Sequence, residues 1–319
     1  MAVYTHLEDE QLKSLLAEYA VGELVSAKPI AEGVENSNYL LTTSQNRFIL
    51  TLYEKRVKKD DLPFFLGLMQ HLAQGGIECP LPVVRRDGGL LSHAADRPAA
   101  MVSFLKGKSL RRFDNEHLSA LGEAMAKMHL AGEGFALQRE NALAPNRLSP
   151  LFESVQSRVD EFLPGLKDAL AAEIEAMQRW PQLGLPRGVI HADLFPDNVF
   201  FEDDHLSGLI DFYFACNDYL AYDLAIAFNA WCFENHVDFN ITKAQHLISA
   251  YHRIRPLSEA ELDALPLLSR GAAIRFFCTR AHDWFFPVEG AVVTPHDPIE
   301  YLKKWQFHRQ AENFRSYIL

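Results

Sequence analysis

The sequence predicts an α+β protein with two lobes, and three observations lead to this prediction. Residues 24–54 contain three strand-like runs joined by turn residues, which predict a small lobe built on an antiparallel sheet. From residue 114 onward, apolar residues recur mainly at helical spacing, so the large lobe is expected to be mostly helical. Residues 189–213 interrupt these helices with a strand, loop, strand, turn, strand pattern. We expect residues 1–105 to form the small lobe and residues 106–319 the large one.

The composition is that of a globular protein and limits the partners to be expected. The chain has 319 residues, of which 48% are hydrophobic and 23% charged, so two lobes can each bury a core. A net charge of −11 argues against nucleic acid or an anionic membrane as a partner. The four cysteines form no C-x-x-C pair, which is typical of reduced thiols in a cytoplasmic protein. The sequence contains neither a recognisable secretory signal nor an apolar run of membrane-spanning length.

Local signals predict the elements of the small lobe. Thr5 and Glu8 have the spacing of a capping box, which predicts a helix that runs to Gly22. Pro80 and Pro82 are expected to open a strand. The other predicted elements are the three strands within 24–54 with a turn at 44–46, a helix over 62–74, a hairpin turn at 87–89 and a strand over 99–105.

Helices dominate the predicted large lobe. The first follows Asp114 and places Leu118, Leu121 and Met125 on one face, as core positions require. His129 lies on the same face, and we expect it to be a packed core histidine rather than a ligand. The other helices are predicted as two within 149–180, one that begins near 222, and three over 242–255, 258–286 and 298–317.

The stretch from 189 to 213 carries the residues that suggest chemistry. An apolar pair leads into His191, Asp193 follows two residues later, and Asn198 comes five residues after that. Two further apolar runs, separated by an acidic turn, end on Asp211. The alternative is structural, with a packed histidine, aspartates in turns and an asparagine cap. Three oxygen-bearing side chains in this order favour a functional site over that alternative.

Phosphoryl transfer is the chemistry that fits these residues. An attacking hydroxyl needs a carboxylate to orient it and accept its proton, and Mg²⁺ prefers oxygen ligands. Protein kinases carry H-R-D, four residues, N and later D-F-G, and the order and spacing here are the same. The pattern therefore predicts Asp193 as the base and Asn198 and Asp211 as magnesium ligands.

The same residues carry a family resemblance. HADLFPDN and LIDFYFACNDYLAYDLA resemble the aminoglycoside phosphotransferase and choline kinase superfamily, which shares the protein-kinase fold. EGVENSNYLLTT, RFILTLYEK and AAIRFFCTRAHDWF, spread over nearly the whole chain, most resemble its homoserine kinase branch. The resemblance implies a two-lobed kinase-like fold and ATP-dependent phosphorylation of the L-homoserine hydroxyl, a step of threonine biosynthesis. It implies ATP and Mg²⁺ as cofactors and L-homoserine as the small-molecule partner.

The resemblance also implies roles beside the catalytic residues. His191 is expected to hold the shape of the loop, and Asp223 to brace it by accepting backbone hydrogen bonds. The alternative for Asp223 is an acid in the first turn of a helix, where it suits the macrodipole.

Two backbone segments are expected to bind the nucleotide. The turn after the first strand contains Gly33, Asn36 and Ser37, and in a kinase-like lobe it donates N–H groups to the phosphates. Taken alone, such a turn is more often a plain connection. The backbone groups predicted to face adenine are those of Ser103, Phe104 and Leu105.

One position departs from the superfamily. The third strand carries Thr51 where a lysine usually reaches the nucleotide phosphates. Lys55 has the same strand parity but lies about 13 Å further along. The helix over 62–74 contains no glutamate to pair with such a lysine, so both partners of the usual ion pair are missing together. We interpret this as a trait of the branch, and it leaves the phosphate anchor open.

The substrate side offers fewer signals. Charged residues within the apolar helix over 258–286 need partners if they are buried, and a substrate carboxylate could pair with Arg275. The alternative is an internal ion pair, such as Arg280 with Asp283. Asp218 is expected to cap a helix or to face the substrate.

Two other functions remain open from the sequence alone. One is another small-molecule kinase of the superfamily, acting on choline, ethanolamine, methylthioribose or an aminoglycoside with the same catalytic residues. The other is a non-catalytic pseudokinase, which the missing lysine favours and the intact Asp193, Asn198 and Asp211 oppose. The oligomeric state, the number of metal ions and feedback regulation leave no signal in the sequence.

Overall fold

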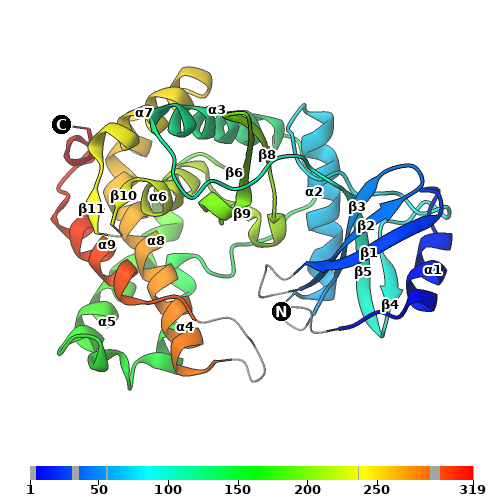
Figure 1. The fold of residues 1–319 in the computed structure, drawn as a ribbon. Coiled ribbons are helices and arrows are strands. Elements are labelled where there is room, and N and C mark those ends of the chain that lie inside the picture. The colour runs from blue at the N-terminus through cyan, green and yellow to red at the C-terminus, as the bar shows by residue number, and fades with distance from the viewer. Residues whose placement is uncertain (1–4, 31–35, 55–56, 236, 288–294, 319) are drawn as a thin grey trace. The chain divides into compact units, whose positions relative to one another are not determined.

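The structure is a computed structural model that describes residues 5–30, 36–54, 57–235, 237–287 and 295–318. The chain divides into two compact units (Figure 1). The first unit runs to Lys106, and the second begins at Gly107.

The first unit is built on one antiparallel sheet with the strand order β1-β2-β3-β5-β4. Figure 1 shows α1 and α2 flanking this sheet. Leu12, Leu15 and Leu16 of α1 share one face at helical spacing and form a core with alternate residues of the strands, such as Tyr39 and Leu50. The elements are α1 (Asp9–Ala17), β1 (Leu24–Ile30), β2 (Ser37–Thr43), β3 (Arg47–Leu52), α2 (Leu62–Gln74), β4 (Ser92–Ala94) and β5 (Arg97–Ser103).

The second unit is mostly helical, with short two-stranded sheets set among the helices. Its helices are α3 (Asn115–Ala131), α4 (Ser149–Val155), α5 (Leu166–Ala176), α6 (Leu220–Trp231), α7 (Ile241–Ile254), α8 (Glu259–Phe285) and α9 (Ile299–Gln310). The strand pairs are β6 (Arg187–Ile190) with β9 (Cys216–Tyr219), β7 (Val199–Glu202) with β8 (His205–Leu209), and β10 (Phe233–Glu234) with β11 (Asp238–Phe239).

Helix α8 forms the centre of the second unit. It begins with a complete capping box between Ser258 and Glu261 and continues for 27 residues. From Gly271 to Cys278 every residue is buried, because α6, α9 and α4 pack around it. Its core includes Ile274, Phe277 and the ring of Trp180. A helix enclosed in this way gives the neighbouring loops a rigid support.

The structure confirms the α+β class and the position of many elements. Helix α2 has the predicted bounds, and the three strands within 24–54, the strand that ends at Ser103, the large-lobe helices and the three strands around the predicted catalytic stretch are present. The predicted capping box is wrong, because the box that starts α1 joins Glu8 to Gln11. Thr5 instead bonds to the sheet, donating from its hydroxyl to Glu54 over 2.6 Å.

Two further predictions differ from the structure, and one strand was not predicted. The last helix ends at Gln310, because Ala311 adopts an extended backbone. Residues near Pro82 form an isolated bridge to Val102 and no regular strand. Strand β9 was not predicted, since Asn217 and Asp218 have low strand propensity and only pairing with β6 makes them extended.

Among the described residues, no helix has both the length and the apolar character needed to cross a membrane.

Gly122 allows α3 and α7 to approach closely. A Cβ atom at this position would overlap the carbonyl oxygen of Leu247 and lie 3.1 Å from the Tyr251 nitrogen. Both are backbone atoms, which cannot move aside without shifting the helix.

We therefore expect Gly122→Ala to lower the free energy of unfolding by about 1–3 kcal/mol, because one methyl group overfills the helix contact. Urea unfolding measures the change. Lys127→Ala, on the exposed side of α3, is the control and should change stability by less than about 0.5 kcal/mol. Equal stability of Gly122→Ala and wild type would contradict the close packing.

Candidate active site

The catalytic loop, residues 191–198, leaves the end of β6 and places Asp193 beside Asn198. The loop turns sharply because Ala192 has a positive φ of 63°. The Asn198 amide nitrogen donates to the Asp193 backbone carbonyl over 2.8 Å and to its carboxylate over 3.1 Å. This orientation leaves the amide oxygen of Asn198 as the atom that can bind a cation.

His191 fastens the loop to the chain that follows β8. The ring is fully buried, its Nε2 lies 2.9 Å from the carbonyl oxygen of Ile210, and it packs on Phe212 with centroids 4.6 Å apart. Burial lowers the pKa of His191, so the ring is neutral at neutral pH. Because a carbonyl oxygen only accepts, Nε2 carries the proton and donates it.

Asp211 lies close enough to Asp193 for the two charges to interact. Its backbone adopts the left-handed conformation, with φ 65° and ψ 60°. The carboxylate is accessible to water, but the protein around it reduces its hydration, and the negative charge of Asp193 adds to this effect. Together they raise the pKa of Asp211 to about 7, against a smaller opposing contribution from the backbone of Tyr213.

These side chains form a set of oxygen donors that suits Mg²⁺. The ion prefers oxygen ligands and usually takes one or two carboxylates from the protein. Burial is the main cause of the raised pKa of Asp211 and the negative charge of Asp193 adds to it, and a divalent cation would offset both effects. The chemistry of the donors therefore fits the predicted metal.

Asp223 holds the start of the loop through backbone hydrogen bonds. Its carboxylate accepts hydrogen bonds from the backbone nitrogens of His191 and Ala192, each over 2.8 Å. The Nε2 atom of His129 lies 3.1 Å from the same carboxylate, and Nδ1 lies 2.7 Å from the Tyr251 hydroxyl. Burial alone would raise the pKa of Asp223, but the hydrogen bond and charge of His129, together with the backbone hydrogen bond of His191, lower it. The carboxylate therefore stays ionised in the interior.

The contact with Asp223 also explains why His129 is buried in the core. The prediction of a buried core histidine is correct, since His129 is 2% exposed. Asp223 lies in the first turn of α6 as well, so the macrodipole alternative is compatible with the hydrogen bonds. The variants Asp223→Asn and Asp168→Asn separate the contribution of the hydrogen bonds from that of the macrodipole.

Two more side chains hold carbonyl groups of the loop. Arg275 donates from Nη1 to the Ala192 carbonyl over 2.6 Å, and the Trp231 ring nitrogen donates to Leu194 over 2.7 Å. Arg275 is only 1% exposed. The structure thus places Nη1 of its guanidinium against the loop, and the role of Arg275 toward a substrate stays a prediction.

Asp218 is also enclosed by protein. Asn141 donates to one of its carboxylate oxygens over 2.8 Å, and Trp180 and the Tyr219 backbone nitrogen donate to the other over 3.3 and 2.8 Å. It lies in β9, and the residue that caps α6 is Tyr219, so the prediction of a helix cap is wrong. Its role toward a substrate stays a prediction.

The predicted phosphate turn is described only in part. Gly33 lies outside the described residues. The Asn36 side chain accepts from the Glu54 backbone nitrogen over 3.2 Å, and the Ser37 hydroxyl donates to the Glu54 carboxylate over 2.9 Å. Both side chains therefore tie the base of the turn to the end of β3.

Thr51, at the position of the usual lysine, pairs with its neighbour on β2. Its hydroxyl donates to the side-chain oxygen of Asn38 over 2.8 Å, directly across the β2–β3 ladder. Thr51 is 4% exposed, so this face of the sheet carries a short neutral pair where the superfamily carries a long cation.

The segment predicted to face adenine follows β5. Ser103 ends the strand, and its nitrogen donates to Leu81. Phe104 donates its N–H to Arg47, whose guanidinium carbon lies 4.0 Å from the Phe104 ring centre. No backbone hydrogen bond from another described residue reaches Leu105, and its role toward adenine stays a prediction.

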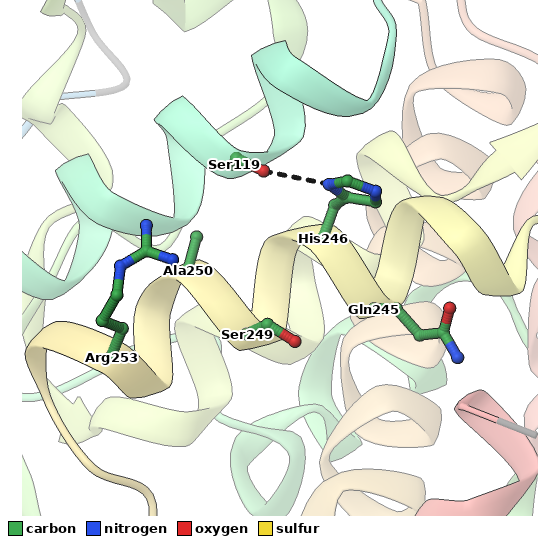
Figure 2. Close-up of a pocket in the computed structure, with 6 residues that line it drawn as sticks. All are labelled: Ser119, Gln245, His246, Ser249, Ala250 and Arg253. Carbon is green, nitrogen blue, oxygen red and sulfur yellow. Dashed lines mark hydrogen bonds between the residues drawn. The ribbon is translucent and has the colours of Figure 1, made fainter.

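A pocket elsewhere on the second unit contains none of the predicted site residues. Figure 2 shows this pocket along α7, where His246 Nδ1 lies 3.1 Å from the Ser119 hydroxyl of α3. Its cation, Arg253, donates to the carboxylate of Glu123 over 2.6 Å. The catalytic loop is thus distinct from this paired, polar surface.

Known proteins with similar sequences are phosphotransferases, as the geometry of the site suggests. Residues 26–257 match the family described as the phosphotransferase enzyme family. The chain belongs to this family. It is 58% identical to the homoserine kinase of Rhizobium rhizogenes, over 100% of the chain and 99% of that relative. The homoserine kinases of Agrobacterium fabrum and Xanthobacter autotrophicus are each 55% identical over 100% of the chain and 99% of their own lengths.

Solved structures share the fold at low identity. An amicoumacin kinase superposes with a TM-score of 0.70 at 16% identity, covering 95% of this chain and 93% of its own. A choline kinase from Cryptosporidium parvum gives 0.67 at 14% identity and covers 95% of both chains. These similarities, together with the relatives, confirm the kinase-like fold and the branch that the sequence resembles.

Sequence reasoning missed the supports of the loop more than its reactive groups. Trp231 and the loop contact of Arg275 were not anticipated, and neither was the contact of His129 with Asp223. The signal for Arg275 was a charge in an otherwise apolar helix, which requires a partner but does not identify it. Trp231 left no signal of this kind.

Asp223→Asn tests the brace. Asparagine replaces one carboxylate oxygen by an amide NH2 group, a donor that would face a backbone N–H donor. We therefore expect a loss of about 3 kcal/mol or more in the free energy of unfolding. Asp168→Asn is the matched control, because Asp168 also lies in a first helical turn, on α5, but is exposed. It should lose at most about 1 kcal/mol. Equal losses of stability in the two variants would mean that Asp223 acts only through the helix macrodipole.

The interaction of the two aspartates predicts how Asp211 titrates. Carbon-13 NMR of the aspartate carboxyls should show Asp211 neutral below, and charged above, a midpoint of about 7. Asp193→Asn removes one of the causes of the raised pKa, so the midpoint should fall. Asp203→Asn, in the exposed turn after β7, should leave it unchanged. An unchanged midpoint in Asp193→Asn would contradict the proximity of the two carboxylates.

Proposed function

We propose that the chain is a homoserine kinase, which transfers the γ-phosphoryl group of ATP to the hydroxyl of L-homoserine. The observation that carries this proposal is the full-length identity of 55–58% to homoserine kinases. The arrangement of Asp193, Asn198 and Asp211 supports it, because these groups supply a base and cation ligands. The products are O-phospho-L-homoserine and ADP, and the pathway is threonine biosynthesis.

Asp193 orients the substrate hydroxyl and accepts its proton. As the oxygen of homoserine bonds to the γ-phosphorus, the bond from phosphorus to the bridging oxygen breaks and ADP leaves with the electron pair. Asn198 holds the Asp193 carboxylate by one hydrogen bond, so the base does not rotate away from the hydroxyl. Asp223, Arg275 and Trp231 hold the backbone on which Asp193 stands.

Asn198 and Asp211 are the proposed magnesium ligands. When bound, Mg²⁺ offsets the charge that develops on the phosphate oxygens. Asp211 must lose its proton to bind the cation, and its pKa of about 7 makes this loss easy at neutral pH. His191 contributes by fixing the loop to the chain segment that presents Asp211.

The nucleotide is proposed to bind through backbone groups. Leu105, with its neighbours Ser103 and Phe104, offers N–H and carbonyl groups to adenine. The turn with Gly33, Asn36 and Ser37 is the proposed donor to the phosphates. Since Thr51 carries no charge, the phosphates depend on these amides and on the cation.

Asp193→Asn should lower kcat by about 10²–10⁴, since the variant keeps the shape of the base but cannot accept the proton. ADP production with Mg-ATP and L-homoserine measures the loss. Asp203→Asn is the control and should retain full activity, because Asp203 lies in the exposed turn between β7 and β8. Full activity of Asp193→Asn would exclude Asp193 as the base.

The same assay identifies the acceptor. We expect turnover with L-homoserine and little with choline, ethanolamine, methylthioribose or kanamycin. A better rate with any of the latter would keep the mechanism and replace the substrate. Bound ATP without turnover on any of them would favour a non-catalytic module.

A further inference from the structure

A second charged cluster lies where α8 meets α9. We define the Arg280 cluster as Arg280, Glu300, Tyr301 and Lys304. Arg280 donates from Nη1 to the Glu300 carboxylate over 2.6 Å, and Lys304 donates to the other oxygen of that carboxylate. The cluster thus contains two cations and one anion, and its charge is not balanced from within.

The cluster is firmly built. Lys304 is 3% exposed and also donates to the backbone carbonyl of Asn229 over 2.7 Å. The Arg280 guanidinium carbon lies 4.4 Å from the centre of the Tyr301 ring, which fixes the plane of the guanidinium. Burial of Glu300 would raise its pKa, but Lys304 and Arg280 lower it to about 2, so the carboxylate stays ionised.

A chain of ring contacts joins the cluster to the catalytic loop. Phe195 of the loop packs edge-on against Phe276 of α8, with centroids 4.9 Å apart, and Phe276 lies 5.2 Å from Tyr301. Phe276 and Arg280 are four residues apart and therefore share one face of α8.

Arg275 marks the same neighbourhood from the other direction. It contacts Ala192, the residue before Asp193, and along the helix it lies about 7.5 Å from Arg280. The charges that act on the Tyr301 hydroxyl include Arg280, Glu300 and Asp193, so the base and the cluster share one region.

Arg280 differs from Arg275 in being partly exposed. Its side chain is 13% exposed and that of Glu300 is 19% exposed, whereas Arg275 is 1% exposed. Both hydrogen bonds of Arg280 to described residues, to Glu300 and to the Asp297 carbonyl, come from Nη1. Within the part of the chain that the structure describes, Nε and Nη2 make no hydrogen bond, and these two parallel donors have the geometry that pairs with a carboxylate through two hydrogen bonds.

We propose that Arg280 binds the α-carboxylate of the amino-acid substrate and thereby selects an amino acid over an amino alcohol. This inference rests on the proposed function, because it assumes that L-homoserine is the acceptor. Glu300 and Tyr301 hold the guanidinium plane in place, and Lys304 keeps Glu300 ionised.

The test compares two acceptors that differ only in the carboxylate. 3-Amino-1-propanol is homoserine without its carboxyl group. Arg280→Gln should lower kcat/KM for L-homoserine roughly 10- to 100-fold, mainly through KM, because charge-assisted hydrogen bonds are lost. The same variant should leave kcat/KM for 3-amino-1-propanol and KM for ATP nearly unchanged. Selectivity between the two acceptors, measured as the ratio of kcat/KM values, should collapse.

Two further variants keep the outcome clear. Arg280→Lys retains the positive charge but not the paired donors, so it should recover part of the loss on L-homoserine. Arg253→Gln is the matched control, since Arg253 also donates to a glutamate over 2.6 Å but lies on the α7 surface shown in Figure 2. It should leave selectivity intact.

The possible results distinguish a failure of the Arg280 proposal from a failure of the proposed function. Equal losses on both acceptors in Arg280→Gln would overturn the proposal and assign Arg280 a purely structural role. If that variant fails to fold, wild-type kinetics of Arg280→Lys on L-homoserine would overturn it as well. Wild-type protein that phosphorylates neither acceptor would reject the proposed function itself, a failure distinct from a loss of selectivity in an active enzyme.

Discussion

The catalytic loop depends on one buried carboxylate. Asp223 has no access to water, and an ionised group in that position is tolerated only if donors surround it. Two of those donors are the backbone N–H groups of His191 and Ala192, so satisfying Asp223 forces the loop into the turn that follows β6. The positive φ of Ala192 is the local cost of that turn. Asp193, the next residue, is therefore positioned by a constraint in the core and not by its own contacts alone.

The sequence predicted what local patterns encode. Helix α2 and the order of Asp193, Asn198 and Asp211 depend on spacing along the chain, which is visible without a structure. The contacts of Arg275 with Ala192 and of His129 with Asp223 join residues that lie 83 and 94 positions apart, and no local pattern specifies such partners. Strand β9 was missed for the same reason, because its extended form comes from pairing with β6.

The two arginines of α8 show how one helix serves two purposes. They lie about 140° apart around the helix axis, so they face different surroundings. Arg275 is enclosed and donates to the Ala192 carbonyl of the loop. Replacing Arg275 would leave that carbonyl without this donor. Arg280 lies at an accessible edge and is held flat by Tyr301. The sequence recognised that both charges need partners, but only burial distinguishes a structural cation from one that can meet a ligand.

The repulsion between Asp193 and Asp211 has a consequence for how the site works. Burial and the nearby charge of Asp193 together raise the pKa of Asp211 to about 7, so ionisation of both carboxylates at once is disfavoured. A proton or a divalent cation relieves this repulsion, and the two compete for Asp211. Asp223 and His191 hold the backbone next to both carboxylates, since they bond to the Ala192 nitrogen and the Ile210 carbonyl. A cation bound at the proposed site would offset this repulsion, and the buried brace would hold the ligands in place for it.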